Sequence, residues 1–326
     1  VVCLLRDRIS TKSIVEGAFL SAITALLFLA SFYIPLLGTL ISFLCPLPII
    51  ILCLRHNVKV ALLALFISFF LVTLVAGPFQ GLIAVLGFGI LGITLGIVIK
   101  KKLSILEILL IGSFSSFIAK ILLMIIGLWL IGVNPLLLGL EQIDQGISQS
   151  LNFYQNMGIN PEQLETYKNS LLQSLELIKI AFPAMLILGS VFDTIINYWV
   201  TEKILKRLGY SMEPFTPFHQ WRVGHSFFWS YLLGIFLLII NTKYNLPVLQ
   251  RIGVNIQLLF SIIFLITGLA MIAHLFQYYK MKPFFFWVTC GIVFIQPLLS
   301  LLVTWIGILD VWIDFRRLFF TEKRTD

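Results

Sequence analysis

Long apolar segments alternate with short polar ones along most of the chain. A helix needs about 20 apolar residues to cross the hydrocarbon part of a bilayer. The pattern predicts nine such segments, at Ser13–Phe32, Leu36–Leu54, Val58–Ala76, Phe79–Ile99, Ile105–Gly132, Ile180–Val200, Val223–Ile240, Val254–Tyr279 and Phe284–Leu309. We therefore expect an all-α polytopic membrane helix bundle of about eight or nine transmembrane segments.

One stretch, residues 134–179, is too polar to lie in lipid and separates the first five apolar segments from the last four. It holds two runs of apolar residues at helical spacing, with start signals for the second helix at Asn160 and Pro161. The stretch predicts an amphipathic helical hairpin at the outer membrane surface, either as a lid over a cavity or as a plain connection between two bundles. The expected parts are 1–133, 134–179, 180–309 and an interfacial tail at 310–326.

The composition agrees with this pattern. Hydrophobic residues make up 59% of the chain and charged residues 12%, and the mean hydropathy is +1.01. Soluble globular domains have about 45–50% apolar and about 25% charged residues. The first apolar run lacks a small-residue cleavage site, so we expect it to remain as a span rather than to be a cleaved signal.

Charge sets the expected orientation. The formal net charge of +8 comes from basic residues in short clusters at the ends of apolar segments, which is the positive-inside pattern and not a nucleic-acid-binding stripe. Fourteen of them lie at alternate ends that would be cytoplasmic, and the opposite loops hold four, Lys168, Lys179, Lys243 and Arg251. The N-terminus is thus expected in the cytoplasm, with the hairpin outside.

The tail conflicts with nine crossings, because nine would put it outside although it is basic. Either the last segment, broken at Gln296-Pro297, does not cross fully, or an earlier one is re-entrant, such as the run at Cys45-Pro46. Both alternatives remain open on the sequence.

Polar residues within spans are the best pointers to function, since they are costly in lipid and normally face a bundle interior or a wet cavity. The candidates for solute binding are Lys120, Asp193, Asn197, His274 and Gln296. Lys120 and Asp193 each lie about 18 Å from the outer end of their segments, so they could pair. The pair could hold a substrate or proton, or it could only fix helix packing. For His274, a packing hydrogen bond is favoured over a proton relay.

Small residues mark close helix contacts. Ala18-x-x-x-Ala22 and Gly17-x-x-x-Ser21 lie on adjoining ridges of the first span, where another helix could approach closely. The run Gly87-Phe88-Gly89-Ile90-Leu91-Gly92 matches the dinucleotide fingerprint by letter, but no strand precedes it and no acidic residue follows at the required distance. It is better interpreted as a packing face.

With its Ala18 and Ala22 motif, its prolines in the second segment and a fourth span ending in Lys100-Lys101-Lys102, the first block resembles the S components of energy-coupling-factor (ECF) vitamin transporters. The resemblance implies that Ala18 and Ala22 contact a coupling subunit that works with ATPases.

Two basic segments could bind lipid or a protein partner. The loop after the sixth span holds Lys203, Lys206, Arg207, Trp221 and Arg222. The tail is expected to form an amphipathic helix with Asp310, Asp314, Arg316 and Arg317, in which Asp314 and Arg317 are in pairing range. The tail, together with the Trp199 to Gly209 and Trp221-Arg222 segments, resembles the YybS-like family of uncharacterised bacterial membrane proteins.

No motif of a known enzyme class is present: the sequence lacks a P-loop, an H-E-x-x-H and a G-x-S-x-G. Its four cysteines and four histidines show no metal-ligand spacing, so we expect no metal, no cofactor and no enzyme activity. Two hypotheses remain. One is transport-related binding of a small solute, and the other is a membrane scaffold for envelope, division or sporulation machinery.

Overall fold

The structure confirms an all-helical polytopic architecture. The computed structural model describes residues 10–35, 37–132, 135–157, 160–207, 209, 212–313 and 316. Its helices are α1 (Thr11–Tyr33), α2 (Gly38–Ser42), α3 (Leu47–Arg55), α4 (Val58–Ala76), α5 (Pro78–Leu82), η2 (Ile83–Gly89), α6 (Ile90–Lys100), α7 (Ile105–Ile131), α8 (Pro135–Asn156), α9 (Pro161–Arg207), η3 (Phe218–Gln220), α10 (His225–Tyr244), α11 (Pro247–Tyr278), α12 (Pro283–Ile295) and α13 (Pro297–Ile313). No described residue lies in a strand.

Within this described part, eight helices or helix combinations are long and apolar enough to cross a membrane, or nine if a bent pair counts as one span. That pair is α12 and α13, which meet at an angle of 113° around Gln296. The predicted break of the last segment at Gln296-Pro297 is therefore present in the structure. The proline-containing run at Cys45 instead sits in a candidate span of 18 residues, Gly38–Arg55.

The chain forms two compact units. Unit 1 comprises Val1–Gln173 and Leu186–Pro214, and unit 2 comprises Ser174–Met185 and Phe215–Asp326. The sixth predicted span, placed by the sequence in the second block, thus belongs for most of its length to unit 1. It is also continuous with the second hairpin helix, because α9 runs unbroken over 47 residues.

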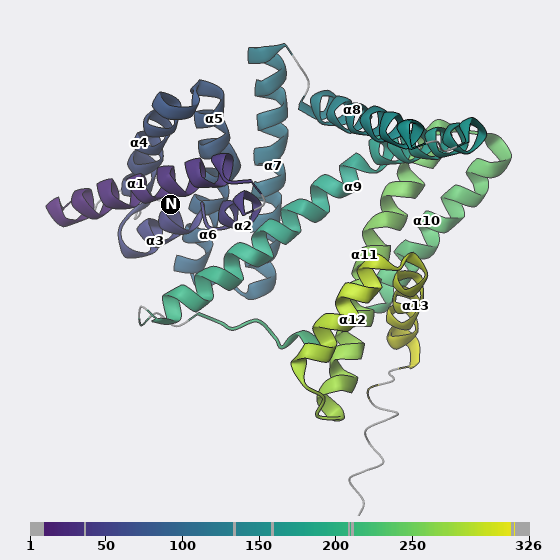
Figure 1. Cartoon of the computed structure of the whole chain (residues 1–326). Helices are drawn as coiled ribbons and strands as arrows, with labels where there is room; N and C mark the ends of the chain where they lie inside the picture. Colours follow the sequence, from purple (N-terminus) through teal and green to yellow (C-terminus); the bar gives the residue numbers. More distant parts are fainter. Residues whose placement is uncertain are drawn as a thin grey trace, which may run out of the picture. The chain divides into compact units, whose positions relative to one another are not determined.

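Small residues bring the helices of unit 1 together, and Figure 1 shows α1 to α7 gathered in one bundle. A Cβ on Gly96 of α6 would lie 2.3 Å from the Cβ of Cys53 on α3, and one on Gly92 would lie 3.0 Å from the Pro46 carbonyl oxygen. Gly92 and Gly96 of the fourth span therefore pack closely against the second segment. The preceding part of the same span, η2, is a π-helix.

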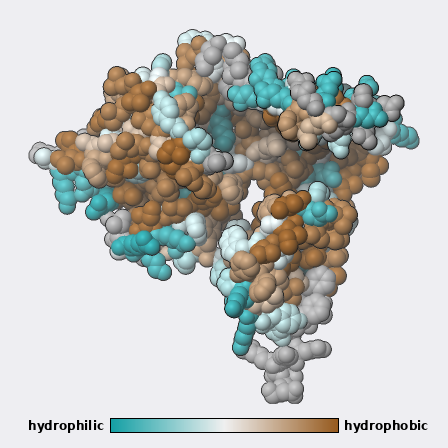
Figure 2. Space-filling view, viewed as in Figure 1, coloured by the Kyte–Doolittle hydropathy of each residue, from teal (hydrophilic) through white to brown (hydrophobic). Residues whose placement is uncertain are grey.

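The α1 ridge of Gly17 and Ser21 faces inward. Gly17 lies against Val60 of α4, and the Ser68 hydroxyl of α4 donates a hydrogen bond of 3.0 Å to the Ser21 carbonyl. In Figure 2, apolar residues form much of the outer surface of this bundle, as expected for helices that face lipid, while hydrophilic residues gather over α8.

Unit 2 packs α10, α11 and α13 around the buried side chains of Tyr231, Phe264 and Ile308. Its piece of α9 contains Pro183, which interrupts helical hydrogen bonding. The side chain of Asn255 on α11 takes the place of the helical hydrogen bond between Ala184 and Ile180. Its Oδ1 accepts from the Ala184 N–H at 2.8 Å, and its Nδ2 donates to the Ile180 carbonyl at 2.7 Å. One amide thereby satisfies both backbone groups around the proline.

Candidate functional site

The centre of α7 places Lys120 deep within a membrane-spanning helix. Helix α7 starts with a capping box formed by Ser104 and Glu107, and it ends at Gly132 in the left-handed conformation. Between these two ends Lys120 lies about 22 Å from the first residue and about 16 Å from the last, at 1.5 Å per residue. Its ammonium group cannot reach water at either helix end without a polar path.

Helix α9 runs antiparallel to α7 and presents a polar face to it. Gly112 permits this approach, since a Cβ there would lie 2.5 Å from the Cγ2 of Thr194. The close contact brings Ser190 and Asp193 of α9 opposite Lys120.

The four side chains form one hydrogen-bonded cluster, which we call the Lys120 cluster: Lys120, Asp193, Ser116 and Ser190. The Lys120 Nζ donates to Asp193 Oδ2 at 2.5 Å, to the Ser116 Oγ at 2.8 Å and to the Ser190 Oγ at 3.1 Å. The Ser116 hydroxyl also donates to Asp193 Oδ2, at 3.1 Å. The predicted pairing of Lys120 with Asp193 is thus present in the structure.

Exposure within the cluster is uneven. Ser116 and Ser190 are each 1% exposed, whereas the side chains of Lys120 and Asp193 retain 29% and 30% of their accessible surface. The two charges therefore sit at an open edge of unit 1, backed by buried hydroxyls. Because a charge that faces lipid is costly, this edge is suited to water or to a polar solute that exchanges hydrogen bonds with the pair.

Asn197 lies one turn beyond Asp193 and is buried, with 1% of its surface exposed. Its Nδ2 donates to the Asp193 carbonyl at 2.8 Å, so its side chain contacts the backbone of the site and not the Asp193 carboxylate. The sequence analysis did not identify Ser116 and Ser190 as members of the site. Helical spacing could have identified them, since Ser116 precedes Lys120 by four residues and Ser190 precedes Asp193 by three.

His274 and Gln296, the other two predicted solute ligands, belong to unit 2. The ring of His274 lies 6.0 Å from the ring of His219, centroid to centroid. Gln296 is exposed at the bend between α12 and α13, where its backbone N–H donates to the Ile292 carbonyl.

The predicted partner residues have different surroundings. Ala18 is exposed and Ala22 half-buried on α1, on the ridge beside the buried Gly17 and Ser21. Arg207 and Arg222 are exposed, and Trp221 is half-buried with its indole N–H donating to the Thr216 carbonyl at 2.9 Å. These positions are all compatible with an outer surface.

Asp310 and Arg316 require a correction, because both side chains lie inside unit 2 and not at an outer surface. They form an ion pair of 3.3 Å with 4% and 6% of their side-chain surfaces exposed. The Arg316 guanidinium also donates to the carbonyls of His219 and Trp221, at 2.5 and 3.0 Å. Asp310 thus belongs to α13, and Arg316 fixes the preceding loop. Asp314 and Arg317, with their predicted pairing, lie outside the described residues.

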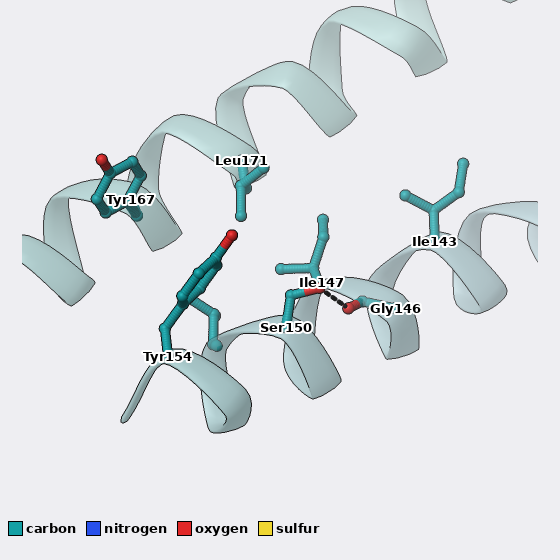
Figure 3. A pocket seen from close by; sticks show the side chains of 8 residues that line it. Ile143, Gly146, Ile147, Ser150, Tyr154, Tyr167 and Leu171 are labelled. Carbon is teal, nitrogen blue, oxygen red and sulfur yellow. Dashed lines mark hydrogen bonds between the residues drawn. The ribbon is translucent and has the colours of Figure 1, made fainter. Parts of the chain in front are cut away.

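The hairpin contains a cavity between α8 and the first part of α9, with a volume of about 500 Å³. Figure 3 shows Ile143, Ile147 and Tyr154 of α8 on the side that faces α9, with Leu171 of α9 opposite Ile147 and Tyr154. The lining holds no charged side chain. This arrangement agrees with two amphipathic helices that face each other, and it differs chemically from the charged Lys120 cluster.

The described residues contain no group of three or more His, Cys, Asp or Glu side chains that could hold a metal ion. The Lys120 cluster offers ionic and hydrogen-bonding recognition by an ammonium, a carboxylate and two hydroxyls.

Comparison with known proteins shows what the chain is similar to. The model of a family described as "Predicted membrane protein (DUF2232)" matches residues 22–311. The chain is also 23% identical to "Uncharacterized protein YybS" of Bacillus subtilis (strain 168) over 309 residues, which are 94% of this chain and 98% of that relative. No solved structure matches it significantly. These matches confirm the resemblance to the YybS-like family.

Proposed function

We propose that this chain, which belongs to the DUF2232 family of predicted membrane proteins, binds a small solute at the Lys120 cluster as part of a transport process. The observation that carries the proposal is the partial exposure of Lys120 and Asp193 in the middle of apolar helices. Ion pairs with a purely structural role need no open edge. A solute carboxylate would replace Asp193 on the Lys120 ammonium, and the two serine hydroxyls would keep their places behind it.

The energy for transport would come from another chain or from an ion gradient, since the sequence has no P-loop. The exposed Ala18 and half-buried Ala22 support docking of a helix from a coupling subunit on that side of α1. By the same proposal the N-terminus lies in the cytoplasm of a bacterial cell and the hairpin faces outward, as the distribution of basic residues indicates.

The test is ligand-dependent thermal stabilisation of the full chain, purified in mild detergent, against a panel of vitamins and small carboxylate metabolites. A ligand at 100 times its Kd stabilises a protein by about 2.7 kcal/mol. We expect at least one compound to raise the Tm of the wild type and not that of Lys120→Met. Lys101→Met, which removes an exposed lysine of the same unit, should respond like the wild type.

A charge-exchanged variant, Lys120→Asp with Asp193→Lys, separates binding from folding. It restores an ion pair but moves the ammonium to the other helix, so we expect a Tm near that of the wild type without stabilisation by the ligand. If no compound stabilises the wild type, the proposed function is wrong.

A scaffold for envelope, division or sporulation machinery is the second candidate. It is supported by the exposed Arg207 and Arg222 and by the loop at Trp221, which Arg316 holds in place. Purification from native membranes distinguishes the two functions. A coupling subunit with ATPases, or a bound small solute, would accompany a solute-binding protein, whereas envelope or division proteins that are lost on Arg222→Ala would accompany a scaffold.

A further inference from the structure

One face of α9 carries polar residues beyond those of the Lys120 cluster. They recur at intervals of three or four residues and therefore lie along one side of the helix. We call this row the polar seam, and it consists of Ser190, Asp193, Thr194, Asn197 and Thr201. Apart from Asp193 its members are almost completely buried: Ser190 and Asn197 are 1% exposed and Thr194 and Thr201 are 0% exposed.

The two threonines of the seam differ in hydrogen bonding. The Thr194 hydroxyl donates to the Ser190 carbonyl at 2.9 Å, which is the usual bond of a threonine in a helix. The Thr201 hydroxyl and the Asn197 Oδ1, by contrast, have no hydrogen-bond partner among the described residues. A buried polar atom without a partner costs about 1–3 kcal/mol. The Thr201 hydroxyl and the Asn197 Oδ1 lie one helical turn apart, so a bound water could hydrogen-bond to both.

The seam leads from the Lys120 cluster toward one end of unit 1. Because α9 is antiparallel to α7 and Thr194 lies against Gly112, Thr201 should reach the level of the first turns of α7, about 10 Å further on. A recess of about 350 Å³ opens at this end. Tyr198 of α9 lines it together with Ile99, Lys102, Leu103, Ile108, Met212 and Glu213.

We propose that water molecules occupy the seam from this recess past Thr201 and Asn197 to Asp193, and that they carry protons between Asp193 and the recess. The proposal rests on the proposed function at one point only, namely that Asp193 belongs to the solute site. One proton reaches Asp193 at the open edge of the pair and forms its neutral carboxylic acid. Lys120 keeps its positive charge, loses its anionic partner and becomes the ligand of the solute carboxylate. The proton leaves through the seam and the recess when Asp193 becomes a carboxylate again and the ion pair re-forms.

The charged neighbours of this path are few. Among the described residues, Lys120 is the titratable side chain that contacts Asp193. At the recess, the titratable side chains are Lys102, Glu213 and Tyr198, whose hydroxyl donates to the Glu213 carbonyl at 2.6 Å. Solute binding and proton uptake would therefore be coupled through the Lys120 and Asp193 pair. This coupling assigns a proton gradient as the energy source that acts on this unit.

Cysteine labelling tests whether the seam is wet without any knowledge of the solute. The full chain, with its four native cysteines replaced by alanine, receives either Thr201→Cys or Thr194→Cys, and both variants are treated with a small methanethiosulfonate in membranes. The matched pair shares residue type, helix face and 0% exposure. Thiolates form only where water is present, so we expect Thr201→Cys to be labelled and Thr194→Cys to remain unlabelled. Equal absence of labelling, with Lys101→Cys labelled as a surface control, would overturn the proposal.

Proton movement is measured separately in proteoliposomes that contain a pH-sensitive dye, with proton uptake driven by a potassium diffusion potential. We expect uptake with the wild type, slower uptake with the isosteric Thr201→Val and loss of uptake with Asp193→Asn. Labelling of Thr201→Cys without any proton uptake would show a hydrated seam that carries no protons between Asp193 and the recess, and would refute the coupling. A wet, conducting seam with no solute in the thermal panel would refute the proposed function alone.

Discussion

Among the residues that the structure describes, two ion pairs join a basic side chain to an aspartate, and their surroundings differ. In unit 2 the Asp310 and Arg316 pair is almost fully enclosed, with 4% and 6% of the side-chain surfaces exposed. In unit 1 the Lys120 and Asp193 pair keeps 29% and 30% of its surface. Arg316 further binds two backbone carbonyls of a loop, whereas Lys120 binds two hydroxyls on facing helices.

The difference separates a structural pair from an exchangeable one. The guanidinium of Arg316 has a fixed planar set of donors, and it ties α13 to the loop before α10 through the carbonyls of His219 and Trp221. Lys120 is a flexible point charge whose partners are side chains, and side chains can rotate away. A pair at an open edge can therefore accept a solute, while an enclosed pair mainly holds segments together.

Removal of Arg316 should give the largest effect on stability. Arg316→Met leaves the Asp310 carboxylate buried without its partner and leaves two carbonyls without a donor. We expect a loss of about 3–5 kcal/mol in the free energy of unfolding, measured by denaturant titration in detergent. The double variant with Asp310→Leu should recover part of the loss, because it removes the uncompensated charge. A single variant as stable as the wild type would contradict the structural role of this pair.

Glycine substitutions compare the helix crossings behind the two pairs. In unit 2 a Cβ on Gly268 of α11 would lie 2.0 Å from the Val303 carbonyl oxygen of α13, and backbone atoms cannot yield. In unit 1 a Cβ on Gly112 would meet a side-chain methyl of Thr194, which can shift. We expect Gly268→Ala to cost about 1–3 kcal/mol, more than Gly112→Ala. Gly189→Ala, with no atom within 4 Å, is the control.

The same contrast explains what the sequence can predict. The spans follow from hydropathy, and the pairing of Lys120 with Asp193 follows from depth, because two charges at similar depth in lipid have few other partners. Their serines lie at helical spacing and could have been found in the same way. Helical spacing also led to the wrong surroundings for Asp310: its partner Arg316 lies beyond the end of α13, at a position that no helical repeat defines.

Other features depend on contacts between residues far apart in the chain. Asn255, which binds the α9 backbone next to Pro183, lies 71 residues after Ala184 in the sequence. The residues around the proline therefore do not predict whether the helix breaks or continues there. The continuity of α9 therefore follows from packing within unit 2. The bend at Gln296 lies at the predicted break, but its angle of 113° is set by how α12 and α13 pack, which hydropathy does not describe.

The smallest stability effect is expected at Lys120. Asp193 retains 30% side-chain exposure after Lys120→Met, and the Ser116 hydroxyl can still donate to it. A partly exposed ion pair contributes little, so we expect a loss of about 1 kcal/mol or less in the same denaturant titration. If the Asp310 and Arg316 pair stabilises the fold and the Lys120 and Asp193 pair binds a ligand, Arg316→Met must lose clearly more stability than Lys120→Met. Equal losses at both sites would mean that Lys120 is also a packing residue, and the open edge beside it would then have no role in binding.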